Sequence, residues 1–189
     1  MTIDQPPTDA TENAAVGVND EQLLARFARG DRGSRAALQE LARRHERRLL
    51  GLALGLCDGR EDLAREAVQE TWVRVIRHAG KFRGKSSFAT WVYRIAVHRC
   101  GDAMARERAV ARREGRAGSR PTPASVGDDG AREAVARLPQ PEREVVLLCH
   151  MRGMTHEQAA AVLGIPPGTL KTRMTRAMCK LREMMGAES

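Results

Sequence analysis

The chain has 189 residues, of which 42% are hydrophobic, 30% charged and 3% aromatic, a composition that favours one or two small helical domains over a large catalytic core. The net charge is +8, and the residues up to Glu21 contain acids but no Lys or Arg, so the remainder is more basic than the whole. Such a balance favours a polyanionic partner such as nucleic acid, with a solvated basic surface as the alternative. The sequence shows no signal peptide and no stretch as long as a membrane span, so we expect a cytoplasmic protein without membrane insertion.

Catalytic and metal-binding patterns are missing from the sequence. The four cysteines and five histidines show no spacing typical of a metal site. No glycine-rich phosphate loop and no nucleophile elbow occurs. We therefore expect a protein that is not an enzyme, with no catalytic residues, no metal, no cofactor and no small-molecule substrate. A helical metal-dependent hydrolase would need clustered histidines and carboxylates, which the sequence lacks.

Apolar residues in the first half of the chain recur at steps of three and four, which predicts four amphipathic helices. They are expected over residues 20–30, 34–56, 61–79 and 87–106. Asp20 is a plausible N-cap of the first helix, and Ser86 or Ser87 caps the fourth. His45 lies in the apolar stripe of the second helix and is interpreted as a core residue. Ile76 is placed on the inward face of the third.

The second half begins with a linker rich in Arg, Gly, Ser and Pro and continues with short helices over residues 131–138 and 141–152. A helix-turn-helix follows, in which Thr155 and Gln158 form a capping box and Gly164 makes the turn. The last helix starts near Pro167. Its predicted core-facing residues are Leu170, Met174, Ala177, Met178, Leu181 and Met185. The predicted organisation is a disordered acidic tail at 1–19, a helical domain at 20–106, a linker at 107–130, a second helical domain at 131–185 and a tail at 186–189.

Two cationic segments are candidates for nucleic-acid binding. From Lys171 to Arg182 the last helix carries five cations and no acid, which suits the major groove and its phosphates. The loop 81–87 combines cations with an aromatic residue and suits single-stranded nucleic acid. The alternatives are a solvated basic helix in an ordinary bundle and a plain connection in which Phe82 and Trp91 fill the core.

Two blocks of sequence resemble the extracytoplasmic-function sigma factors of bacterial RNA polymerase. The first block, residues 63–75 and 81–96, is similar to region two of that family, and the second is similar to region four. The second block comprises Leu138-Pro139, Arg143, residues 168–173 and Arg176-Ala177. The resemblance implies an all-α protein of two small helical domains, a region two bundle and a region four helix-turn-helix, joined by a flexible linker. It also implies a promoter-specificity subunit that binds core RNA polymerase and promoter DNA, promotes DNA melting and is controlled by an anti-sigma factor.

The resemblance assigns roles to three sets of residues. Core polymerase binding falls on Glu66, Gln69 and Glu70. Binding of the −10 element falls on Lys81, Phe82, Arg83, Gly84, Lys85, Ser86, Ser87, Trp91, His98, Asp102 and Arg106. Binding of the −35 element falls on Lys171, Thr172, Arg173 and Arg176. The pattern of the last helix adds two residues to this set, Thr169 at its N-terminus and Lys180 on the flank that carries Arg173 and Arg176. The alternative, a stand-alone helix-turn-helix regulator, explains the basic last helix but not the acidic face followed by a cationic loop.

Overall fold

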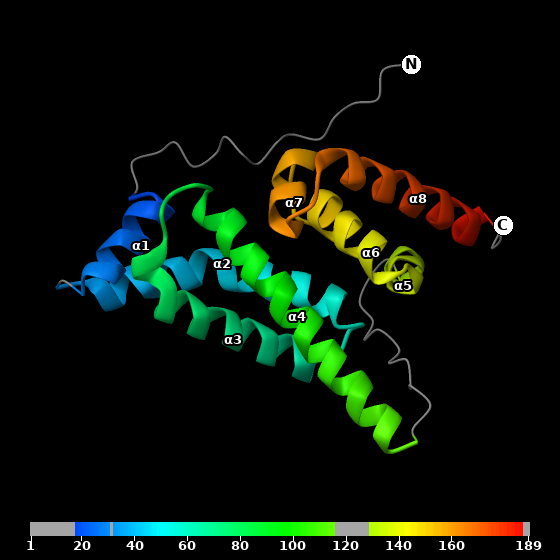
Figure 1. Cartoon of the computed structure of the whole chain (residues 1–189), viewed down its shortest axis with the longest axis horizontal. Coiled ribbons are helices and arrows are strands. Elements are labelled where there is room, and N and C mark those ends of the chain that lie inside the picture. The colour runs from blue at the N-terminus through cyan, green and yellow to red at the C-terminus, as the bar shows by residue number, and fades with distance from the viewer. Residues whose placement is uncertain (1–17, 31, 116–128, 187–189) are drawn as a thin grey trace.

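The computed structural model describes residues 18–30, 32–115 and 129–186, and within these ranges every regular element is a helix (Figure 1). The elements are α1 (Asp20–Arg29), α2 (Ser34–Leu56), α3 (Glu61–His78), the 3-10 turn η1 (Ala79–Lys81), α4 (Phe88–Arg113), α5 (Asp129–Arg137), α6 (Gln140–Val146), the π-helical turn η2 (Leu147–Met151), α7 (His156–Leu163) and α8 (Pro167–Gly186). Helices α1–α4 form a first bundle and α5–α8 a second, which confirms the predicted all-α class. The predicted N-terminal tail, most of the linker and the last three residues lie outside the described residues.

The start of α1 differs from the prediction by one residue. The N-cap is Asn19, whose Oδ1 accepts from the Gln22 backbone N–H at 2.7 Å, while the Gln22 side chain accepts from the Asn19 N–H at 3.1 Å. Asp20 is not the cap because its carboxylate lies 2.5 Å from Nε2 of His45. His45 is 6% exposed and packs edge-on against Phe88, so its interpretation as a core histidine is confirmed.

The core of the first bundle lies between α2, α3 and α4. Its fully buried side chains include Leu41, Leu49, Leu52, Val75, Phe88 and Val92. Ile76, predicted to face inward, is 48% exposed, so that prediction is wrong. Val75 already occupies the core position, and the next residue of an α-helix is turned by about 100°. Ile76 therefore points outward.

Helix α4 is longer than predicted. It continues to Arg113, and its last turns project beyond the rest of the bundle (Figure 1). The sequence after Ala103 is rich in Ala, Arg and Glu, which are strong helix formers. Nη1 of Arg60 lies 2.9 Å from Oε1 of Glu107 and fixes this part of α4 to the start of α3. The first residues assigned to the linker are therefore helical.

The second bundle contains the predicted helix-turn-helix. The Gln158 N–H donates to Thr155 Oγ1 at 3.2 Å and the Thr155 N–H donates to Gln158 Oε1 at 3.0 Å, which confirms the capping box. Gly164 ends α7 with a φ of 66°, a value that favours glycine. Met185 was predicted to face the core but is 53% exposed, because Met184, three residues after Leu181, takes the packed position.

Candidate nucleic-acid interface

Glu66, Gln69 and Glu70 lie together on the outer side of α3, and all three are exposed. Oε1 of Glu66 lies 3.0 Å from Nη1 of Arg106 on α4, so one predicted polymerase contact is paired with one predicted DNA contact. The exposed Ile76 lies on the same side of α3 as Gln69, which it follows by seven residues, or about two helical turns. An acidic surface that ends in an apolar side chain suits a protein partner better than a nucleic acid.

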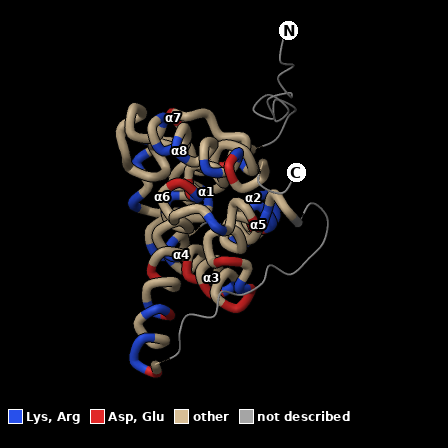
Figure 2. Tube along the Cα trace, turned by 90° about the vertical axis from the view of Figure 1, so that its right-hand side faces the viewer, with Lys and Arg blue, Asp and Glu red and all other residues tan. Residues whose placement is uncertain are grey.

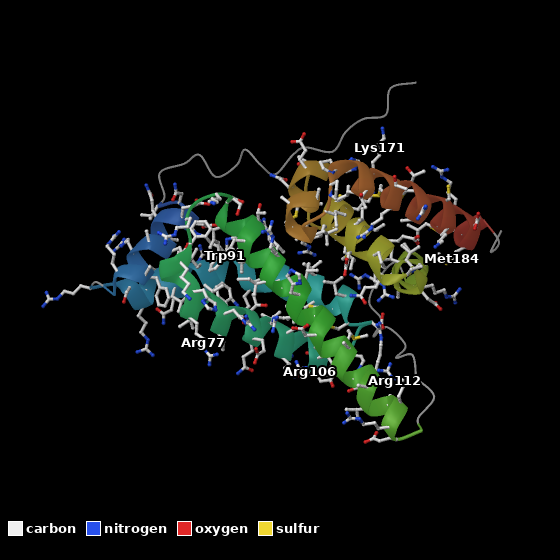
Figure 3. The ribbon with its side chains drawn as sticks, viewed as in Figure 1. Arg77, Trp91, Arg106, Arg112, Lys171 and Met184 are labelled. Atoms are coloured by element: carbon white, nitrogen blue, oxygen red, sulfur yellow. The ribbon has the colours of Figure 1, made fainter. Side chains whose placement is uncertain are left out.

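In the loop 81–87 the cations are exposed to solvent, whereas the neighbouring aromatic side chains are partly buried. Lys81, Arg83 and Lys85 are exposed, while the rings of Phe82 and Trp91 are partly buried with centroids 5.3 Å apart. Figure 3 shows Trp91 in the first half of α4, beside the loop. The aromatic residue of the loop thus packs on the core, while its cations remain exposed.

The middle of this loop and its end at α4 have defined conformations. Gly84 has a φ of 66°, which a residue with a side chain rarely adopts. Ser87, not Ser86, caps α4, since its Oγ accepts from the Thr90 N–H at 3.1 Å. The Phe88 N–H donates to Oε1 of Glu21 on α1 at 2.7 Å. The loop is therefore a short turn that is anchored where it meets α4.

The predicted DNA-facing residues of α4 differ in their surroundings. His98 is exposed, whereas Asp102 pairs with Nη2 of Arg99 at 2.7 Å and Arg106 pairs with Glu66. The structure adds Arg94, whose Nε donates to the backbone oxygen of Ala161 on α7 at 3.1 Å. No sequence pattern pointed to Arg94, because its partner lies 67 residues further along the chain.

Most of the predicted −35 set lies on the outer side of α8. Thr169, Lys171, Thr172 and Arg176 are exposed, and Arg173 is half-buried. Figure 3 shows Lys171 pointing away from the body of the molecule. Lys180 differs from the rest of the set.

Lys180 belongs to an ion pair inside the second bundle. Its Nζ lies 2.7 Å from Oε2 and 3.0 Å from Oε1 of Glu142 on α6. The Glu142 side chain is only 10% exposed. Burying a carboxylate is costly unless a cation compensates it, and Lys180 provides that cation.

The acidic and cationic surfaces lie on opposite sides of the molecule. Helices α3 and α8 run along opposite edges in Figure 1, with α4 between them. In Figure 2 the acidic positions gather along α3 at a distance from the cations of α8. Within the described ranges, no three His, Cys, Asp or Glu side chains group so as to hold a metal ion. No helix in the same ranges has the length and apolar character to cross a membrane.

Comparison with known proteins gives matches along most of the chain. The family model for Sigma-70 region 2 matches residues 41–110, and that for Sigma-70, region 4 matches residues 129–181. The ECF RNA polymerase sigma factor SigM of Mycobacterium tuberculosis is 32% identical over 181 residues, which cover 89% of this chain and 85% of SigM. The RNA polymerase sigma factor CarQ of Myxococcus xanthus is 33% identical over 166 residues, which cover 82% of this chain and 92% of CarQ. The solved structure of CnrH in complex with the cytosolic domain of CnrY has a TM-score of 0.69 and 26% identity, and the match covers 90% of this chain and 99% of CnrH.

Proposed function

The chain belongs to the ECF sigma factors of RNA polymerase. From this premise we propose which of its surfaces bind core polymerase, the −10 element and the −35 element during transcription initiation. It binds core RNA polymerase in the cytoplasm, recognises the −35 and −10 elements of promoters and promotes DNA melting, without catalytic activity of its own. A stand-alone regulator is not favoured, because the region two match covers a part of the chain that such a regulator does not need.

The outer side of α3 is the proposed polymerase-binding surface. The loop 81–87 and the adjoining side of α4 take the melted −10 strand, whose backbone the exposed cations can follow. The outer side of α8 takes the −35 duplex. This assignment of partners to surfaces rests on one observation: the acidic surface on α3 is separate from the cationic surface of α8. The domain limits stay at 20–106 and 131–185 as proposals, although helix α4 itself extends further.

A protein partner of the anti-sigma type is part of this proposal. CnrH was solved in complex with the cytosolic domain of CnrY, so a sigma-like chain of this fold offers surfaces that another protein can cover. The acidic side of α3 and the cationic side of α8 are both exposed here and suit such a partner.

The polymerase assignment is tested by replacing Glu66, Gln69 and Glu70 together with Ala. Run-off transcription with core RNA polymerase and a native promoter should fall at least tenfold, while the helical circular dichroism is unchanged. The matched control is the double variant Glu61→Ala with Arg65→Ala, which removes an exposed ion pair of 2.5 Å from the first two turns of α3. Equal activity of the triple variant and the control would contradict the assignment.

A further inference from the structure

Helix α1 lies beside both ends of the loop 81–87. The turn η1, in which the loop begins, packs against α1. At the other end, the backbone N–H of Phe88 donates to Oε1 of Glu21 on α1 at 2.7 Å. Figure 1 shows the connection from α3 to α4 running next to α1. A helix from an earlier part of the chain therefore contacts the loop where it starts and where it meets α4.

The hydrogen bond to Glu21 satisfies a donor that α4 cannot satisfy itself. Phe88 is the first residue of α4, and the first N–H groups of a helix have no acceptor within it. The cap of this helix does not serve Phe88, because Oγ of Ser87 accepts from the N–H of Thr90 instead. Phe88 is fully buried, and a buried N–H without an acceptor is costly. Glu21 thus provides the acceptor that this position needs.

A carboxylate is a suitable acceptor at this point. The N-terminus of a helix carries a partial positive charge, which a negative side chain stabilises. Hydrogen bonds to a charged group are shorter and stronger than those between neutral groups, and 2.7 Å lies in their range. Glu21 is half-buried, so solvent screens the interaction only in part. A neutral side chain of the same length would keep the acceptor, whereas a shorter side chain would not reach the N–H of Phe88.

Helix α1 is itself fixed to α2. Oδ2 of Asp20 lies 2.5 Å from Nε2 of His45, and Oδ1 of Asp20 lies 2.9 Å from Nη1 of Arg44. Asp20 directly precedes Glu21, so one residue joins α1 to α2 and the next joins α1 to α4. The acceptor of the Phe88 N–H is therefore held in a position that the rest of the first bundle determines.

Phe88 is the innermost of three aromatic residues that pack in a row toward the loop. Its ring centroid lies 6.1 Å from that of Trp91, and the centroid of Trp91 lies 5.3 Å from that of Phe82. Trp91 and Phe82 both belong to the predicted −10 set. Because closely packed side chains transmit a displacement to their neighbours, the position of Phe88 affects both of them.

We propose that Glu21 is a positioning residue for binding of the melted −10 strand: its carboxylate holds the first residue of α4, and through it the loop 81–87, in the conformation that takes the strand. Glu21 acts through the N–H of Phe88 and not by contact with DNA. It lies before residues 41–110, which the region 2 model matches, so the family match assigns it no role. The DNA part of this inference rests on the function proposed above; the anchoring of Phe88 does not.

Permanganate reactivity of the −10 region, measured with core RNA polymerase and a native promoter, tests this role. Glu21→Ala removes the acceptor and should lower the reactivity about tenfold, as expected for the loss of one hydrogen bond to a charged group. Glu21→Asp keeps the charge but is shorter by one methylene group, so it should lower the reactivity similarly. Glu21→Gln keeps the reach and an acceptor oxygen, so it should stay within about threefold of the parent. Binding of a −35 duplex should be the same in the parent and in each variant.

The matched control is Asn19→Ala, which removes the N-cap of α1 and leaves the bond to Phe88 in place. It should leave the permanganate reactivity near that of the parent. Equal losses in Glu21→Ala and Asn19→Ala would show that only the stability of α1 matters, and would overturn the proposal. Parental reactivity in Glu21→Asp, or a loss in Glu21→Gln as large as that in Glu21→Ala, would overturn it too, since charge and not reach would then decide.

Hydrogen exchange of the Phe88 amide in the free, full-length chain tests the anchoring separately. The amide should lose protection in Glu21→Ala and Glu21→Asp and keep it in Glu21→Gln and Asn19→Ala, with unchanged helical circular dichroism. If Glu21→Ala is poorly folded, the comparison of Glu21→Asp with Glu21→Gln decides. Equal protection in the parent and Glu21→Asp overturns the proposal. Failure of the parent chain to melt a promoter with core polymerase refutes the proposed function, while amide exchange still decides the anchoring.

Discussion

Replacing Lys180 with Ala should weaken the folding of the second bundle and leave DNA binding nearly unchanged. Lys180 compensates the carboxylate of Glu142, which is 10% exposed, while the lysine itself is 43% exposed. Removing one partner of a fully buried ion pair costs about 3–5 kcal/mol, whereas an exposed pair contributes about 1 kcal/mol or less. The environment of this pair lies between these limits, so we expect a loss of about 1–2 kcal/mol.

The assay is urea unfolding of the full chain, followed by far-ultraviolet circular dichroism. Lys180→Ala should unfold at lower urea, and adding Glu142→Gln should recover part of the loss, because the buried group is then neutral. The matched variant is Lys171→Ala on the outer side of the same helix. Its stability should equal that of the parent, but its salt dependence of promoter binding should weaken by about 0.9 in log–log slope, the effect of one lost phosphate contact.

The refuting result is specific. Unchanged stability of Lys180→Ala, together with a salt slope reduced as in Lys171→Ala, would show that Lys180 binds phosphate and that Glu142 does not need it. The cationic flank of the last helix would then have placed Lys180 correctly in the −35 set.

Two further predictions concern the helix ends. Burial raises the pKa of Asp20, but the hydrogen bonds and charges of His45 and Arg44 outweigh it and hold this pKa below its ordinary value of 3.8. A carboxylate with a lowered pKa in the folded state stabilises the protein above its ordinary pKa, and this stabilisation is lost as the pH falls. Asp20→Asn should therefore flatten the decline of the melting temperature below about pH 4. A parallel decline of the melting temperature in the variant and the parent would contradict this. Thr155→Ala should cost about 1 kcal/mol in thermal or urea unfolding, because the Gln158 N–H loses its acceptor, whereas Thr155→Ser should not; equal losses in both variants would exclude the cap as the cause.

The sequence predicted those parts of the fold that depend on neighbouring residues. The capping box of Thr155 and Gln158 and the turn at Gly164 are local, so the residue types and their spacing suffice. Side-chain direction was less predictable at the edge of an apolar stripe. Ile76 and Met185 are hydrophobic and lie one residue beyond the packed position, and hydrophobic periodicity does not distinguish such a residue from its buried neighbour.

The sequence identified the charged residues of the candidate site but not the residues of the same chain with which they pair. Lys180 and Glu142 are 38 residues apart and Arg94 and Ala161 are 67 apart, so no spacing rule relates them. The sequence located the cations of α8, and the structure separated the paired Lys180 from exposed cations such as Lys171.

The π-helical turn η2 makes the position of Arg152 sensitive to how the chain winds there. A π turn bonds each N–H to the carbonyl five residues earlier, so it contains one residue more than α-helical winding would. If the same residues, Leu147 to Met151, wound as α-helix instead, the additional residue would turn everything beyond it by about 100° relative to α6. Arg152, whose Nη1 donates to the Arg48 carbonyl at 3.1 Å, would then leave that carbonyl, although the chemical character of the segment would be the same. The register of this one turn, rather than its composition, aims the helix-turn-helix at the first bundle.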